Sequence, residues 1–237
     1  MNIVSIVNRN SYSNNPGVES ETDGKATTRF ERQRLRTRRL LLDAGRTLIA
    51  AKGVASLRIQ DITEEADVAL GSFYNYFESK EELLEAVITE SLSDLTSAII
   101  TNVDDDTDPA AVVALANLRV IRLAYDEPDF ARLIVNIGHS EALFGDAVQP
   151  YARIAVERGI ESGRFIVADI EVLLTAVIGG AFALIREILK GRHGANAHQA
   201  FARHVLASLG LPPHEAESIV SAADSRDQTG GQTSLQP

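Results

Sequence analysis

Side chains suited to contacting a nucleic acid gather between Arg58 and Lys80. Serine and asparagine can reach a base edge or a phosphate, tyrosine hydroxyls can bind phosphate, and arginine can pair with phosphate or with guanine. An exposed leucine can meet a thymine methyl group, and a glycine lets the backbone approach DNA closely. The candidate contact residues are Arg58, Gln60, Leu70, Gly71, Ser72, Tyr74, Asn75, Tyr76 and Lys80.

Several of these residues have a second interpretation that the sequence leaves open. Leu70 could pack against a neighbouring helix, and Gly71 could serve tight helix packing. Tyr74 and Tyr76 could be half-buried tyrosines of the core. Arg58 could bind guanine through two hydrogen bonds or simply pair with a phosphate, whereas a phosphate is the favoured partner of Gln60.

Two short helices joined by a tight turn must carry these side chains. Ile59, Ile62 and Ala66 recur at helical spacing, the pattern then breaks for two residues, and Phe73 and Phe77 resume it four residues apart. The second helix, expected over about residues 69–77, would place its N-terminal turn in the major groove, with both phenylalanines facing the core. This pattern predicts a helix-turn-helix.

A preceding helix over residues 37–52 completes a small core, because five residues form one apolar face at helical spacing: Leu41, Ala44, Gly45, Leu48 and Ile49. Gly53 can adopt the left-handed conformation that ends a helix, and Lys52 suits the negative end of the helix dipole. The sequence therefore predicts three short helices sharing one core.

Ser79 and Glu82 have the spacing of a capping box, which predicts that the next helix begins here. Lys80 lies just inside this start, where a cation opposes the helix dipole. A DNA phosphate drawn to the same place would explain the lysine. The alternative is a solvated lysine with no partner.

The formal net charge of −10 is unevenly distributed along the 237 residues. Between Lys25 and Arg58, ten basic residues stand against two acidic ones, a local balance of +8 that leaves −18 elsewhere. This asymmetry favours a polyanion at one end of the molecule. Residues 1–28 have the composition of a disordered arm, after which Arg29, Arg32 and Arg36 could contact DNA or contribute only diffuse attraction.

The composition also bears on the compartment. The chain has no cysteine and its first residues lack the apolar stretch of a secretory signal, which favours the cytoplasm. The longest apolar run, Val172 to Ile185, is shorter than the ~20 residues of a membrane-spanning helix. We expect no membrane partner.

The remaining sequence is helical in pattern, so we expect an all-α fold. Asp108, Pro128 and Asp169 are expected at helix starts, and helix breaks are predicted around residues 101–110, 126–129, 138–146, 162–169, 190–197 and 210–213. The predicted division is a disordered arm (1–28), a helix-turn-helix domain (29–78), a helical effector-binding and dimerisation domain (79–223) and a disordered tail (224–237).

At this point the chain resembles the TetR family of bacterial transcriptional repressors. The resemblance rests on residues 59–63 (IQDIT), 71–77 (GSFYNYF) and 79–83 (SKEEL) and is specific over about residues 37–87. Asp67 stands where glycine is usual, Ala69 replaces the usual serine cap, and Tyr76 replaces histidine. Asp tolerates positive φ, whereas the loss of the cap costs ~1 kcal/mol.

One such unit contacts few base pairs, so we expect a homodimer that binds two half-sites of double-stranded operator DNA. Val172 to Ile185 is apolar all round and would face both its own core and a partner, with Gly179 and Gly180 permitting close approach. The alternative is a central helix inside one bundle. The resemblance implies a second interface helix over about residues 197–209.

The resemblance also implies a small, largely apolar effector of unknown identity that lowers operator affinity. Any of the expected ligand-binding residues could instead be plain core; they are Phe130, Leu133, Ile134, Asn136, His139, Phe144, Tyr151, Phe182 and Arg186. An alternative function is a DNA-binding regulator without a small-molecule effector, acting through a protein partner or as an activator.

No catalytic or cofactor motif is present in the sequence. We find no nucleophile elbow, phosphate-binding glycine loop or dinucleotide fingerprint, so we expect neither an enzyme nor a cofactor. His193, His198 and His204 are five and six residues apart, which does not align them on one helix face. We therefore expect no metal site.

Overall fold

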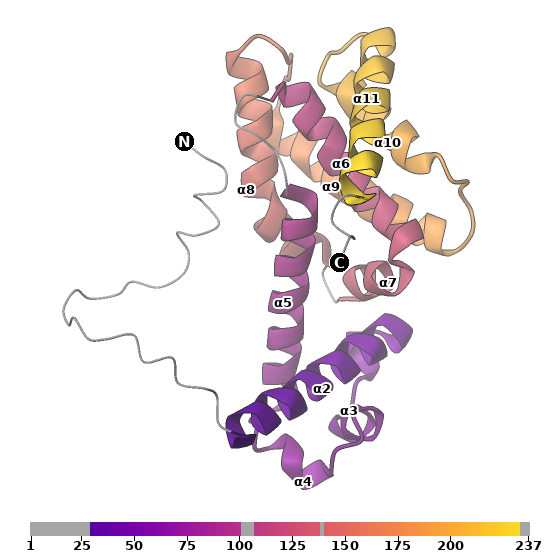
Figure 1. Cartoon of the computed structure of the whole chain (residues 1–237). Helices are drawn as coiled ribbons and strands as arrows, with labels where there is room; N and C mark the ends of the chain where they lie inside the picture. The colour runs from indigo at the N-terminus through magenta and orange to yellow at the C-terminus, as the bar shows by residue number, and fades with distance from the viewer. Residues whose placement is uncertain (1–28, 101–106, 138–139, 233–237) are drawn as a thin grey trace, which may run out of the picture.

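The computed structural model describes residues 29–100, 107–137 and 140–232, and every regular element within these ranges is a helix (Figure 1). The all-α prediction is confirmed. The helices are α2 (Arg29–Lys52), the 3-10 turn η2 (Val54–Ser56), α3 (Ile59–Glu65), α4 (Leu70–Phe73), α5 (Lys80–Ile100), α6 (Pro109–Asp126), α7 (Pro128–Asn136), α8 (Ser140–Glu161), α9 (Ile170–Leu189), α10 (Ala197–Ser208) and α11 (Pro213–Gln232).

The molecule has a small lower part and a larger upper part. We call α2, η2, α3 and α4 the head and α6 to α11 the bundle. The long helix α5 rises from the head and joins the bundle (Figure 1). The predicted arm, residues 1–28, lies outside the described residues.

Capping side chains begin two bundle helices at the predicted residues. Asp108 Oδ1 accepts a hydrogen bond from the Ala110 amide at 3.0 Å, with proline at the start of α6. Asp169 Oδ1 accepts from the amides of Glu171 and Val172 at 2.9 and 3.1 Å. Each carboxylate satisfies amides that the first helical turn leaves unpaired.

The start of α5 and the end of α2 are also close to prediction. Ser79 Oγ accepts from the Glu82 amide at 3.1 Å, while Glu82 Oε2 accepts from the amide of Glu78 at 2.5 Å, one residue earlier than a regular capping box. Gly53 donates to the Ile49 carbonyl at 2.9 Å and ends α2 with a φ of 75°, a positive value that favours glycine, although its ψ of 165° differs from the left-handed helical conformation that the sequence predicts.

Two helix starts differ from the prediction. Helix α2 begins at Arg29 rather than near Thr37, because arginine and leucine favour helix even where no core holds them. Helix α8 begins at Ser140, so residues 140–146 are helical where a break is predicted.

One apolar cluster runs from the head into the bundle. In the head it contains Leu41, Ile49, Leu57, Ile62, Phe73 and Phe77, and it continues through α5 into α6, α7 and α9. A second cluster joins α6, α8, α9, α10 and α11 and includes Leu118, Phe165, Leu206 and Leu209. Because the first cluster is continuous, the head is packed on the bundle rather than tethered to it.

Helix α9 buries one face and exposes the other. Its buried residues are Leu174, Ile178, Ala181, Phe182, Ile185 and Ile188, whereas Val172 is 64% exposed. The helix is long and apolar enough to pass for a membrane span, with a mean hydropathy of 2.0 over a window that is 33% buried. The core helix of a soluble protein can pass the same test. Within the described residues, α9 is therefore not a central helix buried on all sides in one bundle.

The C-terminal segment differs most from the prediction. Helix α11 extends to Gln232, so residues 224–232 are helical rather than a disordered tail. Arg122 on α6 binds both Asp224 and Asp227, the latter at 2.7 Å. Arg119 also binds Asp227, at 2.8 Å, and these groups are largely buried. The composition of the segment alone does not reveal these ion pairs, because the partner arginines lie about a hundred residues upstream. For this reason, the prediction of a disordered tail is wrong for residues 224–232.

We predict that Asp224→Ala destabilises the protein, because it leaves the buried Arg122 guanidinium without one of its two carboxylates. The expected loss of unfolding free energy is about 3 kcal/mol, measured by urea denaturation. The control is Glu217→Ala, which breaks an exposed pair with Arg203 at 3.1 Å and should cost less than ~1 kcal/mol. Equal losses in the two variants would contradict the prediction.

Candidate nucleic-acid interface and internal cavity

Helices α3 and α4 are joined by the tight turn that the sequence predicts. Asp67 has a φ of 52° and is the one non-glycine residue with positive φ in the described part of the chain. The Val68 amide donates to the Thr63 carbonyl at 2.9 Å and closes the turn. Aspartate tolerates this conformation better than most residues, so the departure from glycine is accommodated.

Helix α4 is shorter than the expected span of residues 69–77. The α-helix covers Leu70–Phe73, and the chain continues in turns, with Asn75 donating to Ser72 at 3.2 Å and Tyr76 to Phe73 at 2.9 Å. Ala69 provides no side-chain cap, as its type implies. Phe73 and Phe77 are 0% and 2% exposed, as predicted, and they hold this segment on the head's core.

The outer side of this segment forms a surface that we call the DNA face: Leu70, Gly71, Ser72, Tyr74 and Asn75. Leu70 is 52% exposed and Tyr74 58% exposed, so neither is a core residue. A β-carbon added to Gly71 would meet nothing within 4 Å. Tight helix packing therefore does not explain this glycine. The DNA face lies at the lower tip of the molecule (Figure 1).

Two candidate contact residues are less exposed than the DNA face. Tyr76 is half-buried and packs against the head's core. Lys80 is also half-buried, and its Nζ lies 3.9 Å from Glu81 Oε1 on α5. Their roles toward phosphate stay predictions, as do those of the DNA face.

Arg58 is held by an acid on its own helix. Its Nη2 and Nε donate to the carboxylate of Asp61 at 2.9 and 3.3 Å, and Lys52 Nζ donates to the same carboxylate at 2.6 Å. Hydrogen bonds from Arg58 and then Lys52 lower the pKa of Asp61, so the carboxylate is ionised at neutral pH. A contact with phosphate or guanine through Nε and Nη2 would require Arg58 to exchange this carboxylate, whereas Nη1 takes no part in the pair. Gln60 similarly donates to Glu64 at 3.0 Å.

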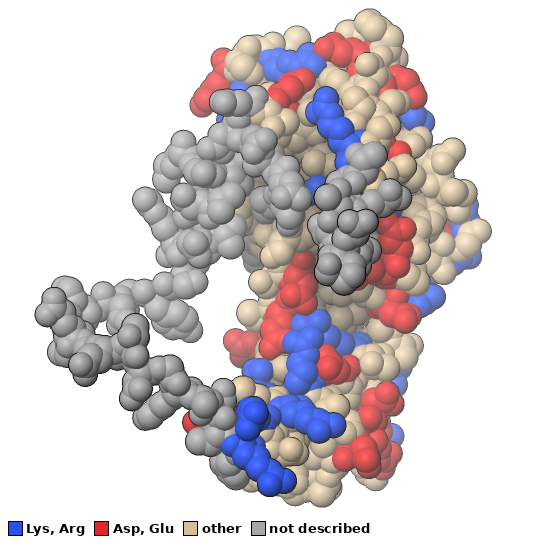
Figure 2. Space-filling model, viewed as in Figure 1, with Lys and Arg blue, Asp and Glu red and all other residues tan. Residues whose placement is uncertain are grey.

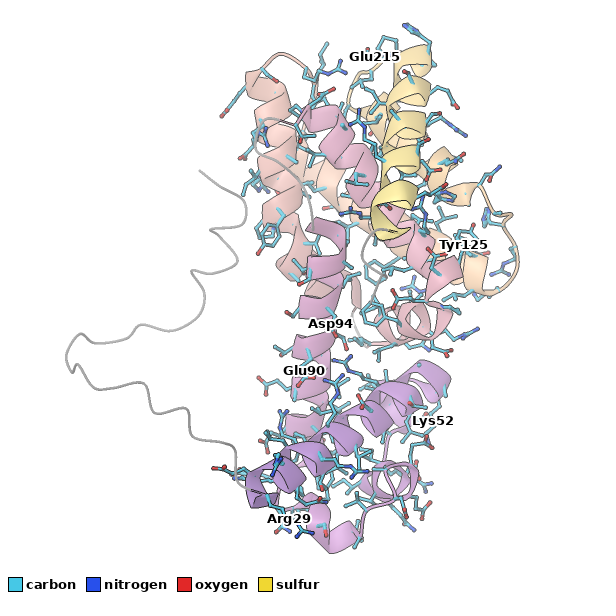
Figure 3. All side chains as sticks on the ribbon, viewed as in Figure 1. Arg29, Lys52, Glu90, Asp94, Tyr125 and Glu215 are labelled. Carbon is cyan, nitrogen blue, oxygen red and sulfur yellow. The ribbon has the colours of Figure 1, made fainter. Side chains whose placement is uncertain are left out.

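Arginines cover the N-terminal part of α2. Arg36 is exposed, and Figure 2 shows basic side chains gathered at the lower end of the molecule. Arg38 lies over the Phe77 ring, 5.4 Å from its centroid, and pairs with Glu90 at 3.4 Å. Figure 3 labels Arg29 at the outer end of this helix.

The other end of α2 contacts the bundle. The Asn136 side chain on α7 donates from Nδ2 to the carbonyl of Ala50 at 3.0 Å. This carbonyl belongs to the last turn of α2, where helices leave carbonyls without partners. On the flank of α2, Arg46 pairs with Glu90 at 3.3 Å and Asp94 at 3.1 Å on α5 (Figure 3).

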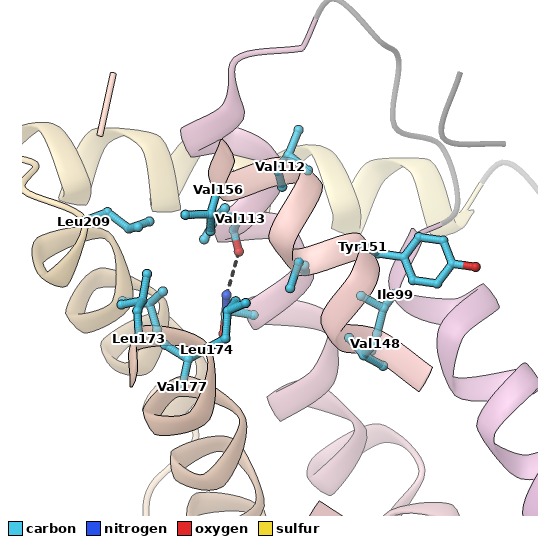
Figure 4. Close-up of a pocket in the computed structure, with 15 residues that line it drawn as sticks. Ile99, Val112, Val113, Val148, Tyr151, Val156, Leu173, Leu174, Val177 and Leu209 are labelled. Carbon is cyan, nitrogen blue, oxygen red and sulfur yellow. Dashed lines mark hydrogen bonds between the residues drawn. The ribbon is translucent and has the colours of Figure 1, made fainter. Parts of the chain in front are cut away.

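A partly open cavity of about 100 Å³ lies between the bundle helices and the end of α5 (Figure 4). Side chains from α5, α6, α8, α9 and α10 line it, and most are aliphatic: Ile99, Val112, Val113, Ala116, Val148, Ala152, Ala155, Val156, Leu173, Leu174, Val177, Val205 and Leu209. Asn117 and Tyr151 complete the lining. Such a cavity suits a small, mostly apolar molecule.

Asn117 is the buried polar group of this cavity. It is 9% exposed, and its Nδ2 donates to the Val113 carbonyl at 2.8 Å, the dashed line in Figure 4. This bond fixes which end of the carboxamide is nitrogen. Sequence reasoning missed Asn117, although an asparagine in the apolar run AAVVALANLRVI was the available signal.

The predicted ligand-binding residues are dispersed. Tyr151 lines the cavity, whereas Leu133, Ile134 and Phe182 are buried in the cluster shared with the head. Phe130 packs against that cluster. Asn136 binds Ala50, and Arg186 lies on the last turn of α9. His139 lies outside the described residues, as does the side chain of Phe144.

Comparisons with known proteins agree with this arrangement. Residues 41–87 match the family described as bacterial regulatory proteins, tetR family. Residues 108–222 match a tetracyclin repressor-like C-terminal domain. The two matches together cover the head from Leu41 onward, the first part of α5 and most of the bundle.

Curated relatives match part of this chain. The HTH-type transcriptional repressor DhaR of Mycobacterium sp. (strain GP1) is 39% identical over 72 residues, which is 30% of this chain and 36% of that protein. The repressor KstR2 of Rhodococcus jostii is 32% identical over 80 residues, 34% of this chain and 35% of that protein. These matches span about a third of the length of those relatives.

A solved structure matches nearly its whole length. RolR (NCGL1110) in complex with the ligand resorcinol is 30% identical, with a TM-score of 0.62, and the match covers 80% of this chain and 95% of that chain. RolR without ligand gives a TM-score of 0.59 at the same identity, covering 76% and 95% of the two chains. These proteins are regulators rather than enzymes, and the chain belongs to the TetR family of DNA-binding transcriptional regulators.

Proposed function

We propose that this protein is a dimeric, cytoplasmic repressor that binds operator DNA through the DNA face and leaves it when a small ligand fills the cavity. The observation that carries the proposal is the exposed DNA face on a head whose core continues into the bundle. Selection from random duplexes by the intact protein tests it. Enrichment of a sequence with two related half-sites is expected, and recovery of no preferred sequence would contradict it.

The cavity supports a specific class of effector. A dry cavity of about 150 Å³ is known to hold benzene, so about 100 Å³ has room for no more than a single ring, and the lining would have to move apart slightly to admit it. Asn117 supplies a carboxamide within a mostly aliphatic lining, and the Tyr151 ring points away from it (Figure 4). RolR, which is 30% identical, binds resorcinol. We infer a single-ring compound with one or two hydroxyl groups that hydrogen-bond to Asn117.

The exposed side of α9 supports a dimer. Small residues dominate it, at spacings of three and four, and they are Val172, Thr175, Ala176, Gly179 and Ala183. Small side chains let two helices approach closely, and burying an exposed apolar helix face favours association. The second interface helix expected over residues 197–209 corresponds to α10, which exposes Ala200, His204 and Ala207.

Helix α5 supports a route from ligand to DNA. Ile99 near its C-terminal end lines the cavity, and Leu83 and Val87 near its start belong to the apolar cluster of the head. A ligand that fits one position of α5 better than another shifts the population of head positions. The rival function, a regulator without a small-molecule effector, has the same DNA face but no use for the cavity.

We predict that Gly71→Ala weakens operator binding without harming the fold. The added methyl group has open space in the free protein, and alanine favours helix by up to ~1 kcal/mol, so Tm should be unchanged or higher. The methyl group would hold the backbone away from DNA, for an expected loss of about tenfold in affinity. Gly194→Ala, also at an open position, is the control. Unchanged operator affinity of Gly71→Ala would contradict the assignment.

We predict that Asn117→Leu reduces the response to monocyclic phenols. With resorcinol as the probe, the variant should need about tenfold more ligand to raise Tm and to release operator DNA, because one buried hydrogen bond is lost. Asn196→Leu, at an exposed position, is the control. An unaltered dose response would exclude Asn117 as the anchor. A wild-type protein that responds to no monocyclic phenol would favour the rival function.

We predict that Ala176→Arg separates the dimer. A charged side chain in the centre of the exposed α9 face would be desolvated in the complex, so light scattering should report monomers and operator affinity should fall by at least tenfold. Ser218→Arg, on an exposed position of α11, should leave the mass unchanged. A dimer that persists in Ala176→Arg would exclude this face.

A further inference from the structure

The first twelve residues of α2 carry an unusual density of charge. This segment, residues 29–40, contains six arginines and one glutamate, a balance of +5 in a chain of net charge −10. We call it the arginine extension. At 1.5 Å per residue it is about 18 Å long. The apolar face of α2 that packs in the head's core begins only at Leu41.

Most of the arginine extension is exposed. Arg29 and residues 31–36 are all exposed, and Leu35 is 61% exposed. Arg38 and Arg39 pair with Glu90, at 3.4 and 3.7 Å. Within the described part of the chain, by contrast, Arg29, Arg32, Arg34 and Arg36 form no ion pair. Their charges are therefore available to an external partner.

The position of the arginine extension points to the same partner as the DNA face. Arg38 lies 5.4 Å from the centroid of the Phe77 ring, and Phe77 ends the turn that follows α4. The extension thus leaves the head beside the DNA face and continues outward at the same end of the molecule (Figures 1 and 2). Its basic surface is continuous with the surface that would meet the operator.

Resting on the proposed function, we propose that the arginine extension binds the phosphates of the duplex that flanks the half-site. Arg29, Arg32 and Arg36 are three and four residues apart, so they share one helix face. Phosphates recur about every 3.4 Å along a strand, and an 18 Å helix can therefore bring these three arginines to one backbone. Phosphate contacts add affinity and footprint length without reading bases.

The balance of charge favours DNA over other polyanions. The rest of the chain carries −15, which repels an acidic surface that approaches from the bundle side. The DNA face and the arginine extension both lie at the end of the molecule away from the bundle, so a duplex that contacts both would keep its distance from the acidic bundle (Figure 1). An acidic protein or membrane surface has no such second point of attachment.

The experiment uses the full chain and the triple variant Arg29→Gln/Arg32→Gln/Arg36→Gln. Two duplexes contain the selected operator, one ending at the half-sites and one with about ten further base pairs on each side. On the long duplex, the variant should bind at least tenfold more weakly at physiological salt. The slope of log affinity against log salt should fall by nearly three per head, while base preference is unchanged.

The matched control removes the same charge from the bundle: Arg132→Gln/Arg192→Gln/Arg203→Gln. It should bind both duplexes as the wild type does. Equal binding of the two triple variants to the long duplex would overturn the inference. An equal loss of affinity of the arginine-extension variant on both duplexes would also overturn it, because the contacts would then lie inside the half-sites. If the wild-type protein binds the short and the long duplex with equal affinity, the inference is overturned but the proposed function is not. If it binds neither duplex, the proposed function is overturned.

Discussion

The packing of α2 against three neighbours is the constraint on which the rest of the structure depends. Its apolar face holds α3 and α5, and its C-terminal turn rests on α7. At Gly45 the approach is so close that an added β-carbon would lie 3.0 Å from Leu83 and 3.2 Å from Val87. Asn136 binds the Ala50 carbonyl at the end of the helix. Because α2 is held on all these sides, the head follows any movement of α5 or α7.

Apolar contact, rather than ion pairing, carries most of this connection. The pairs of Arg46 with Glu90 and Asp94 are partly exposed, and pairs of this kind contribute little to stability in water. The apolar cluster that connects Phe73 in the head to Phe182 on α9 consists of buried side chains. The polar contacts give the packing its register, and the core supplies most of its free energy.

Features that depend on residues close together in the sequence are the ones that the sequence predicts correctly. The caps at Asp108 and Asp169, the positive φ of Gly53 and the inward phenylalanines depend on side chains within a turn of each other, and all are observed. The helical C-terminal segment depends instead on Arg122, a hundred residues away from Asp224. Which residues line the cavity depends on how five helices meet, so Tyr151 is placed there and other predicted residues are not.

Helix α5 connects the cavity to the head, so a small movement at the cavity is enlarged at the head. Ile99 and Lys80 are nineteen residues apart, or about 28 Å along the helix axis. A rotation of α5 by about 5° at the cavity would displace its lower end by roughly 2.5 Å over this length. The head moves with that end, since α2 is packed on it. In the proposed dimer the two displacements would add, so a one-ring ligand that rotated α5 in this way would change the separation of two heads that must match successive major grooves.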